Sequence, residues 1–285
     1  MPNVNPGYRG IAQIGAGGNY VRFTDANIAA KQEINAPDIV MGDWDHDAYV
    51  YGPITVGGTI SGPVTELFVV GATSIWQWAT KRAGECGTLS TNNVHLWYYC
   101  GTGTRKDRNF TGMLVNSLNF SCAAGDIANF SLDVMGSGVT PWGATDAPHY
   151  VTNEKLMTWD KVNLSVSNPR GDIMEHVYSN FDFTISNNLQ MIYSLGQSNL
   201  FPYQIIPGLR TITGSISVYN IPTADGADSW NSYTADNGPA TLTFSIGTAT
   251  FSFKAALHRV EPALGVGPII STVNFTGVTH QTGLD

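Results

Sequence analysis

Charged residues are scarce in this chain of 285 residues: Asp, Glu, Lys and Arg together make up 13% of it. Helix bundles usually cover their surfaces with Glu, Lys, Ala and Leu, so a sequence this poor in charge excludes one. The polarity comes instead from Ser, Thr and Asn, which together with 31 glycines suit strands and tight turns. We therefore expect a mainly β protein.

Long apolar runs are also missing. No stretch approaches the roughly 20 residues that a membrane-spanning helix needs. The first ten residues, MPNVNPGYRG, lack the charged-then-apolar profile of a signal peptide. We expect a soluble protein that has no membrane partner and stays in the compartment where it is made.

Cysteine is rare. The three cysteines, Cys86, Cys100 and Cys122, have no CxxC spacing. An odd number argues against a disulfide framework, and the spacing argues against a structural zinc site, so we interpret all three as reduced thiols. The six histidines are scattered, with none at metal-ligand spacing. No metal or cofactor is expected.

The few charges have a net sign. The chain has 14 Lys and Arg against 22 Asp and Glu, which gives a formal charge of −8. Because proteins hold nucleic acid with cations that neutralise phosphates, this balance disfavours a surface that grips nucleic acid. It is compatible with a surface that must lie close to DNA without holding it.

The two halves of the chain resemble each other at a nearly constant shift. The matching blocks, in order, are Gly58–Ser61 with Gly214–Ser217, Gly71–Ser74 with Gly226–Ser229, Leu96–Tyr98 with Phe251–Phe253, and Ser117–Ser121 with Thr272–Thr276. Alternation of polarity makes all-β sequences self-similar, but it does not explain glycines at matching positions. We predict two tandem β-sandwich or barrel domains, over 1–139 and 161–285, joined by a connector over 140–160.

Apolar–polar alternation predicts the strands of both halves. We expect strands at 19–24, 49–61, 94–100, 113–122, 127–135, 177–186, 210–219, 240–246, 248–257 and 269–278, and a long polar stretch without a strand over 27–47. A helix is expected over Ser74–Ala83, ended by Gly84, with a shorter helix or turn near Ser229–Ala235 as its counterpart. Gly247 is predicted to form a tight hairpin.

No catalytic motif stands out. The sequence has no GxSxG elbow and no phosphate-binding loop. The acidic run Asp43–Asp47 lacks the glycine and the distal glutamate of a calcium-binding loop, so we interpret it as an acidic loop tip. Trp76 and Trp78 are interpreted as packing residues of the helix rather than as a platform for a sugar ring.

Two stretches resemble the tail tube proteins of tailed bacteriophages. In Phe181–Asn220, a strand is followed by an Asn-Asn step, a Pro-Gly loop and a strand with an Arg-x-x-x-Gly-Ser pattern. Gly112–Gly136 is similar to the paired strands of the same family. The resemblance covers most of the chain, except for 27–47 and the 140–160 connector. It implies β-sandwich domains, each with one short packed helix, six of which form a ring.

The resemblance also implies an assembly. Rings would stack into a tube through which the genome passes, and three chains with two domains each would supply the six units of one pseudo-hexameric ring. Closing neighbouring strands into one inner barrel would remove the unpaired sheet edges. The implied partners are further copies of the chain and sheath, tail terminator, tape measure and baseplate proteins, while DNA passes without specific binding. The implied location is the virion tail, assembled in the host cytoplasm, and no enzymatic activity is implied.

Two segments of opposite charge are candidates for contacts between successive rings. One carries Asp43, Asp45 and Asp47, and the other, interpreted as an exposed loop, carries Arg105, Lys106 and Arg108. Opposite charges attract across an interface. The alternative is that both are solvated loops without a partner.

Two other classes of protein stay open at this point. A β-sandwich recognition or decoration module would use Trp76, Trp97 or Trp142 to bind carbohydrate or a capsid, and would form compact particles rather than rings. A glycan hydrolase would depend on Asp45 or Glu175.

Overall fold

The chain is mainly β, as predicted. The computed structural model describes residues 10–14, 19–21, 23–35, 50–66, 74–83, 88–100, 104–141, 155–167, 177–196, 199–219, 238–247, 249–258 and 270–278. Within them, strands dominate, together with the short helix α2 (Ile75–Thr80) and the 3-10 turn η1 (Trp159–Lys161). No helix in these segments is long and apolar enough to cross a membrane.

The strands of the first half form a single antiparallel series. They are β1 (Gly10–Ile14), β2 (Asn19–Val21), β3 (Asp25–Asn35), β4 (Val50–Pro63), β7 (Asn92–Cys100), β8 (Thr104–Ala123), β9 (Asn129–Gly136) and β10 (Gly138–Val139), with the small pair β5 (Arg82–Ala83) and β6 (Thr88–Leu89) apart from them. Their order in the sheet is β3-β4-β9-β8-β7-β1-β2. The long strand β8 pairs with β7 along its first part and with β9 along its second.

The second half repeats this order. Its strands are β11 (Val162–Ser167), β12 (Val177–Ser186), β15 (Thr211–Tyr219), β16 (Ala240–Ile246), β17 (Ala249–Leu257) and β18 (Ile270–Gly277), with the separate pair β13 (Gln190–Ile192) and β14 (Gln204–Ile206). Their sheet order is β12-β15-β18-β17-β16-β11. If β3, β4, β9, β8, β7 and β1 are matched to these six in turn, the two halves agree in both sheet order and chain order.

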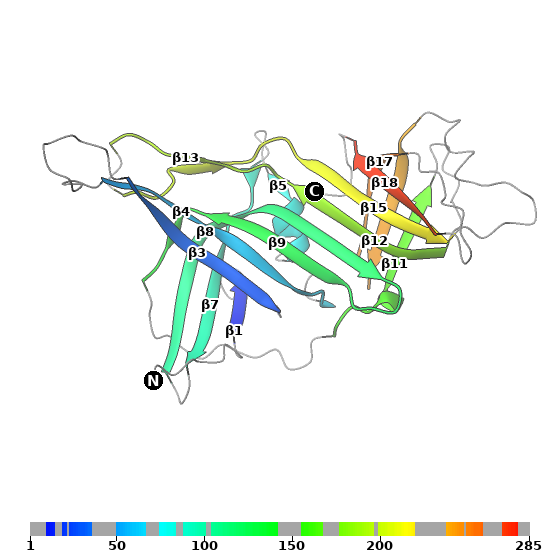
Figure 1. Ribbon diagram of the computed structural model, residues 1–285, viewed down its shortest axis with the longest axis horizontal. Coiled ribbons are helices and arrows are strands. Elements are labelled where there is room, and N and C mark those ends of the chain that lie inside the picture. Colours follow the sequence, from blue (N-terminus) through cyan, green and yellow to red (C-terminus); the bar gives the residue numbers. More distant parts are fainter. Residues whose placement is uncertain are drawn as a thin grey trace, which may run out of the picture.

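One ladder joins the two halves. The second part of β8 pairs with β12, from Ser117 opposite Ser186 to Ala123 opposite Asn180. All these strands therefore belong to one sheet of fourteen strands, which runs across the whole molecule in Figure 1. β8, an inner strand of the first half, therefore lies directly beside β12, which stands at one end of the sheet order of the second half.

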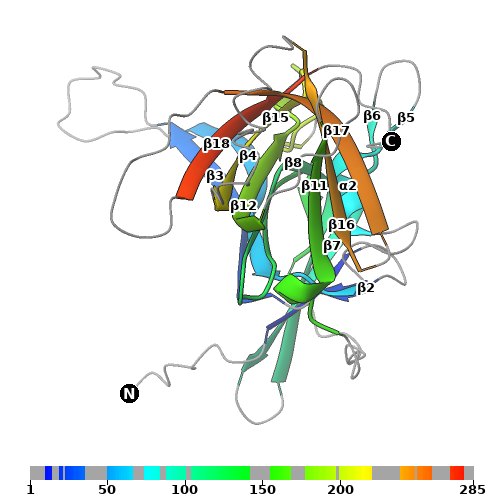
Figure 2. The same ribbon diagram turned by 90° about the vertical axis from the view of Figure 1, so that its right-hand side faces the viewer.

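The sheet folds over into two layers, with the core between them. Seen from its end in Figure 2, β3, β12, β15 and β18 lie on one side, and β7, β11, β16 and the helix α2 lie on the other. The core is rich in aromatic residues, among them Phe120, Phe183 and Phe244. The side chain of Ser74 caps the start of α2, and Trp78 Nε1 donates to the carbonyl oxygen of Met113 at 3.2 Å, so the helix is fixed to β8.

Two sequence expectations need correction. The stretch 27–47 is not without a strand, because β3 continues to Asn35. Among the residues of β3 only Ile28 is fully buried, and Lys31–Ile34 are exposed, so the strand shows little alternation. Two pairs of matched blocks lie in strands that hold different places in the two strand orders: Leu96–Tyr98 and Phe251–Phe253 in β7 and β17, and Ser117–Ser121 and Thr272–Thr276 in β8 and β18. The segment 229–235 lies outside the described residues.

Candidate functional site

One side of the sheet is polar across strands of both halves, and we call it the polar face. Residues paired across strands share one side of a sheet, so the strand register defines its members. They are Asp25, Asn27, Ala29 and Lys31 of β3, Thr55, Thr59 and Ser61 of β4, Asn129, Ser131 and Asp133 of β9, Ser117, Asn119 and Ser121 of β8, Asp182, Thr184 and Ser186 of β12, Thr211, Thr213 and Ser215 of β15, and Thr272, Asn274 and Thr276 of β18.

The carboxylates of the polar face are tied to neighbouring strands. Asn119 Nδ2 donates to Asp182 Oδ2 at 3.2 Å and to Thr184 Oγ1 at 3.0 Å, across the β8–β12 ladder. Ser215 donates its hydroxyl to the other oxygen of Asp182 at 3.4 Å. The first half and the second half therefore share one hydrogen-bonded surface at their junction.

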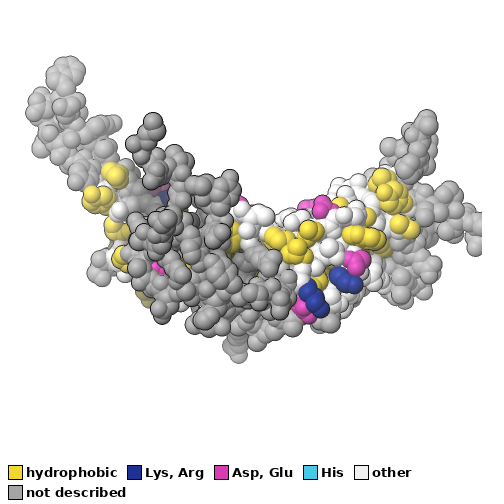
Figure 3. All heavy atoms as spheres, turned by 90° about the horizontal axis from the view of Figure 1, so that it is seen from below, with side chains coloured by type: hydrophobic (Ala, Val, Ile, Leu, Met, Phe, Trp, Pro, Cys, Tyr) yellow, Lys and Arg dark blue, Asp and Glu magenta, His cyan; other side chains and the backbone are white. Residues whose placement is uncertain are grey.

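Charge is sparse on the polar face, and most of it is negative. Its charged members are Asp25, Asp133 and Asp182 against Lys31, and the exposed Lys254 of β17 lies on the same side of the sheet, two residues from Ala256, which pairs with Thr276. Phosphate binding needs several cations that release counterions together. The named members of the polar face do not offer such a set of cations. Charged side chains are also few among the described residues on the side of the molecule that Figure 3 shows.

The outer edge of β3 has no partner among the described residues. β3 pairs with β4 from Asp25 to Asn35 and with no other described strand. An exposed edge is a template for another strand unless charges blunt it. Lys31 and Glu33 are exposed in the C-terminal part of β3. The preceding residues Asn27–Ala30 carry no charge. Among the described residues, no strand pairs with the outer side of this uncharged part.

The charged residues predicted to join rings do not all lie where the sequence suggested. Arg105 and Lys106 belong to β8, where they pair with Tyr99 and Tyr98 of β7, so the interpretation of 105–108 as a loop is wrong. Their side chains, and the acidic residues Asp43, Asp45 and Asp47, lie outside the described residues. Arg108 is half-buried, with its guanidinium carbon 5.6 Å from the centre of the Phe110 ring.

Asp107 of β8 is buried and is paired with the half-buried His95 of β7. The carboxylate of Asp107 is 2.5 Å from His95 Nε2, and the His95 ring stacks on Trp97 with 4.0 Å between ring centres. A carboxylate that loses water needs such a partner. Asp107 is thus a structural member of the β7–β8 hairpin, not part of an exposed charged loop.

The tryptophans proposed for carbohydrate binding are mostly unable to serve that role. Trp76, Trp78 and Trp97 are all buried. Trp76 stacks on Phe251 with 4.0 Å between ring centres. A sugar platform must be exposed, so these three residues cannot form one. Trp142, Asp45 and Glu175 lie outside the described residues.

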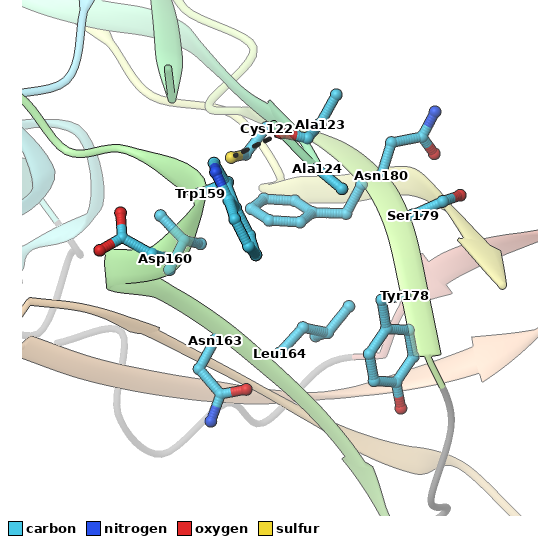
Figure 4. A pocket seen from close by; sticks show the side chains of 12 residues that line it. Cys122, Ala123, Ala124, Trp159, Asp160, Asn163, Leu164, Tyr178, Ser179 and Asn180 are labelled. Atoms are coloured by element: carbon cyan, nitrogen blue, oxygen red, sulfur yellow. Dashed lines mark hydrogen bonds between the residues drawn. The ribbon is translucent and has the colours of Figure 1, made fainter. Parts of the chain in front are cut away.

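A groove of about 500 Å³ opens at the end of the junction between the halves. Figure 4 shows it between the end of β8, the turn η1 and the strands β11 and β12. Burial raises the pKa of the Cys122 thiol on its wall, and the negative charge of Asp126 adds to this rise. Burial also raises the pKa of Tyr178 to about 12. Both groups are therefore neutral near pH 7.

Comparison with known families indicates which class of protein this chain represents. A family model described as phage tail tube protein matches residues 5–277. The chain belongs to the phage tail tube protein family. No curated protein matches it. Membership supports a structural role in the tail tube of the virion, with self-assembly, rather than a role as an enzyme.

Sequence reasoning missed the polar face of this tail tube protein. The signal was present as Ser, Thr and Asn at every second position, for example Ser117, Asn119 and Ser121 in β8. Alternation shows that such residues share one side of a strand. Which strands lie side by side, and that the resulting face is continuous, follows only from the register.

Proposed function

We propose that three copies of this chain form a ring, that rings stack into the tail tube, and that the tube conducts the DNA genome during ejection. The observation that carries the proposal is the repeated strand order, in which two halves with the same topology are joined edge to edge by β8 and β12. Two equivalent units that are joined in tandem each keep one edge that the junction between them does not use. A head-to-tail contact between these edges in neighbouring chains closes a ring.

Two glycines support the equivalence of the halves. In β4, a Cβ on Gly58 would lie 1.8 Å from the carbonyl oxygen of Asn27, and in β15 a Cβ on Gly214 would lie 2.3 Å from the carbonyl oxygen of Asp182. Glycine in a strand commonly marks such a close approach of two backbones. The same special position thus occurs at the same place in both units. This supports tandem domains over 1–139 and 161–285 with a connector over 140–160.

The internal junction indicates which edges meet between chains. β12, which stands at one end of the sheet order of the second unit, pairs with β8 of the first unit. β3 holds the place of β12 in the first unit, and β17 holds the place of β8 in the second. We infer that β3 of one chain adds to the end of β17 in its neighbour. The β17–β18 ladder extends past Leu257, the last residue of β17, because His258 N donates to Asn274 O at 2.8 Å.

In this ring the polar face lines the lumen. It is continuous across both halves through the β8–β12 ladder, and its cations are few. A lumen rich in hydroxyl and amide groups repels DNA weakly and offers no set of cations that would hold it. The genome would therefore slide through.

Proline substitutions in β3 test the ring. Successive N–H groups of an edge strand point to opposite sides, so a proline at Ala29 and a proline at Ala30 remove donors on opposite sides. One of these variants loses a hydrogen bond to β4, and the other loses a donor to the neighbouring chain. We expect the variant that loses only the donor to the neighbouring chain to fold normally, as judged by circular dichroism and thermal unfolding. The same variant is expected to form no closed rings in electron micrographs.

The unmodified chain is the control, for which we expect three-copy rings with pseudo-sixfold symmetry. Tubes of normal length from both proline variants would contradict pairing through β3. Compact particles without a central hole from the unmodified chain would contradict the proposal as a whole, and would favour the decoration module instead.

A contact between rings through opposite charges stays part of the proposal. Its residues are Asp43, Asp45 and Asp47 on one side and Arg105, Lys106 and Arg108 on the other. Replacing the three cations by Glu is expected to shorten the tubes at low salt, because like charges then meet, and to have less effect at high salt, where they are screened. Tube lengths measured by electron microscopy that do not change would remove this contact from the proposal.

A further inference from the structure

A polar cluster behind the sheet ties the two halves together at the β8–β12 junction. It consists of Asn187, which follows β12, Arg210, which precedes β15, and the last carbonyl groups of the helix α2 in the first half. We call it the clasp. These residues belong to the Asn-Asn and Arg-x-x-x-Gly-Ser patterns of the sequence. None of them lies on the polar face.

Asn187 is the centre of the clasp and is completely buried. Its Nδ2 donates to the carbonyl oxygen of Ala79 at 2.8 Å and to that of Val115 at 3.0 Å. Its Oδ1 accepts from Arg210 Nε at 3.2 Å. Buried amides must use their donors and acceptors, and this one uses both donors on carbonyl groups of the other half.

Arg210 completes the contact with the helix. Its Nη2 donates to the carbonyl oxygen of Thr80, the last residue of α2. A reciprocal hydrogen bond has its donor in the first half: Arg82 Nη2 donates to the carbonyl oxygen of Gly208 in the second half at 3.0 Å. Cations at the end of a helix satisfy its free carbonyl groups and oppose its dipole. Each half therefore supplies an arginine to the backbone of the other.

The helix also touches the second half through its apolar face. Trp76 stacks on Phe251 of β17 and meets Phe183 of β12 edge-on, with 6.1 Å between the latter ring centres. The helix α2 thus belongs to the first half by sequence and packs on the second half. Together with the clasp, it forms a second attachment between the halves, away from the plane of the sheet.

A single ladder between two sheet sections leaves their angle poorly fixed, because the twist between neighbouring strands ranges from about −10 to −35°. The clasp and the helix attach the halves outside the sheet as well, as does the hydrogen bond from Ile54 N to Leu200 O, and such attachments restrict this freedom. In a ring of six equivalent units, neighbouring units must be rotated by about 60°. We propose that the clasp sets the angle between the two halves and, through it, the number of copies that close a ring. This rests on the ring assembly proposed above.

The junction between chains cannot contain the same clasp. Ile28 pairs with Gly58 as Phe183 pairs with Gly214, so the register places Gln32 where Asn187 would be. By the same register, Ile54 takes the place of Arg210, and its side chain has no donor. The backbone of Ile54 is already bonded within the chain, to Leu200 O at 2.8 Å. The angle is thus preset inside each chain, and the contacts between chains follow it.

Ring size and the angle between the halves test the clasp. The variants are Arg210→Ala and the milder Arg210→Lys, with Leu242→Ala as a control that creates a cavity in β16, a strand that contributes no residue to the clasp. Copy number is measured by native mass spectrometry and electron microscopy. The angle is measured as the electron spin–spin distance between labels on Thr59→Cys and Thr213→Cys, in a full chain whose three natural cysteines are replaced.

We expect Arg210→Ala to shift or broaden the distance between the labels and to lose closed three-copy rings, while Leu242→Ala keeps both. Three-copy rings and an unchanged distance in Arg210→Ala would overturn the proposal. If Arg210→Ala does not fold, Arg210→Lys decides by the same two measurements. The distance does not depend on assembly, so an unmodified chain that forms no rings would contradict the proposed function without deciding the role of the clasp.

Discussion

Tubes with lysine in place of both Thr59 and Thr213 are expected to hold double-stranded DNA that the unmodified tube lets pass. Both side chains are exposed on the polar face, one in each half. In a ring of three chains the two substitutions place six cations around the lumen, and stacking repeats them along the tube. Cations that neutralise phosphates release counterions, so DNA binding becomes strong and dependent on salt.

The size of this effect can be estimated. With six phosphate contacts, affinity is expected to fall about a thousandfold between about 50 and 200 mM salt. The measurement is retention of short duplex DNA by purified tubes, together with the rate of genome ejection from assembled phage. We expect slow ejection at low salt that recovers as salt is raised.

The matched control replaces the same two residues by glutamine, which has a long side chain without charge. Glutamine tubes are expected to retain no more DNA than unmodified tubes. Equal DNA retention by lysine and glutamine tubes at low salt would place the polar face on the outside of the tube. Normal tube lengths in both variants are needed to exclude a defect of assembly.

Alternation predicted most strands because most strands have one buried side. The expected strands 177–186 and 240–246 coincide with β12 and β16 to the residue. β3 was missed because an edge strand has only one neighbour, and only Ile28 among its residues is fully buried. Its exposed Lys31–Ile34 gave no period that alternation could detect.

The charged segment 105–108 misled for a different reason. Charge in a short stretch indicates a loop when strands are short, but β8 has 20 residues and extends far past its neighbours β9 and β12. Asp107 is buried there with His95 as its partner. A partner twelve residues away in sequence is invisible until the β7–β8 register is known.

The candidate site could be predicted only in part. The Asn-Asn and Arg-x-x-x-Gly-Ser patterns pointed to the family, but their physical role depends on the helix α2, more than a hundred residues earlier in the chain. Asn187 and Arg210 satisfy carbonyl groups of that helix. No local pattern records which carbonyl group a side chain will meet, because that is decided by how the two halves pack.

Replacing Phe183 by alanine is expected to give the largest loss of stability in the chain. Phe183 is completely buried in β12, and its ring contacts aromatic rings from both halves. Ring-centre distances are 4.9 Å to Phe244, 5.6 Å to Phe120 and 6.1 Å to Trp76. Phe-to-Ala substitutions in cores cost about 3–5 kcal/mol, a large share of the 5–15 kcal/mol typical of whole proteins. We expect the upper end, because neighbours from both halves would have to move to fill the cavity.

Urea unfolding of the unassembled chain measures this loss as a lower midpoint with an unchanged slope. Phe183→Leu is expected to lose less, since it leaves a smaller cavity. Tyr203→Ala, which removes a ring that is 66% exposed, is expected to change the free energy of unfolding by less than about 0.5 kcal/mol. One core runs through both halves, so a single transition should shift as a whole. Two transitions, of which Phe183→Ala moves only the one from the second half, would show that the halves unfold separately and that the contacts of Trp76 with Phe183 and Phe251 do not couple them.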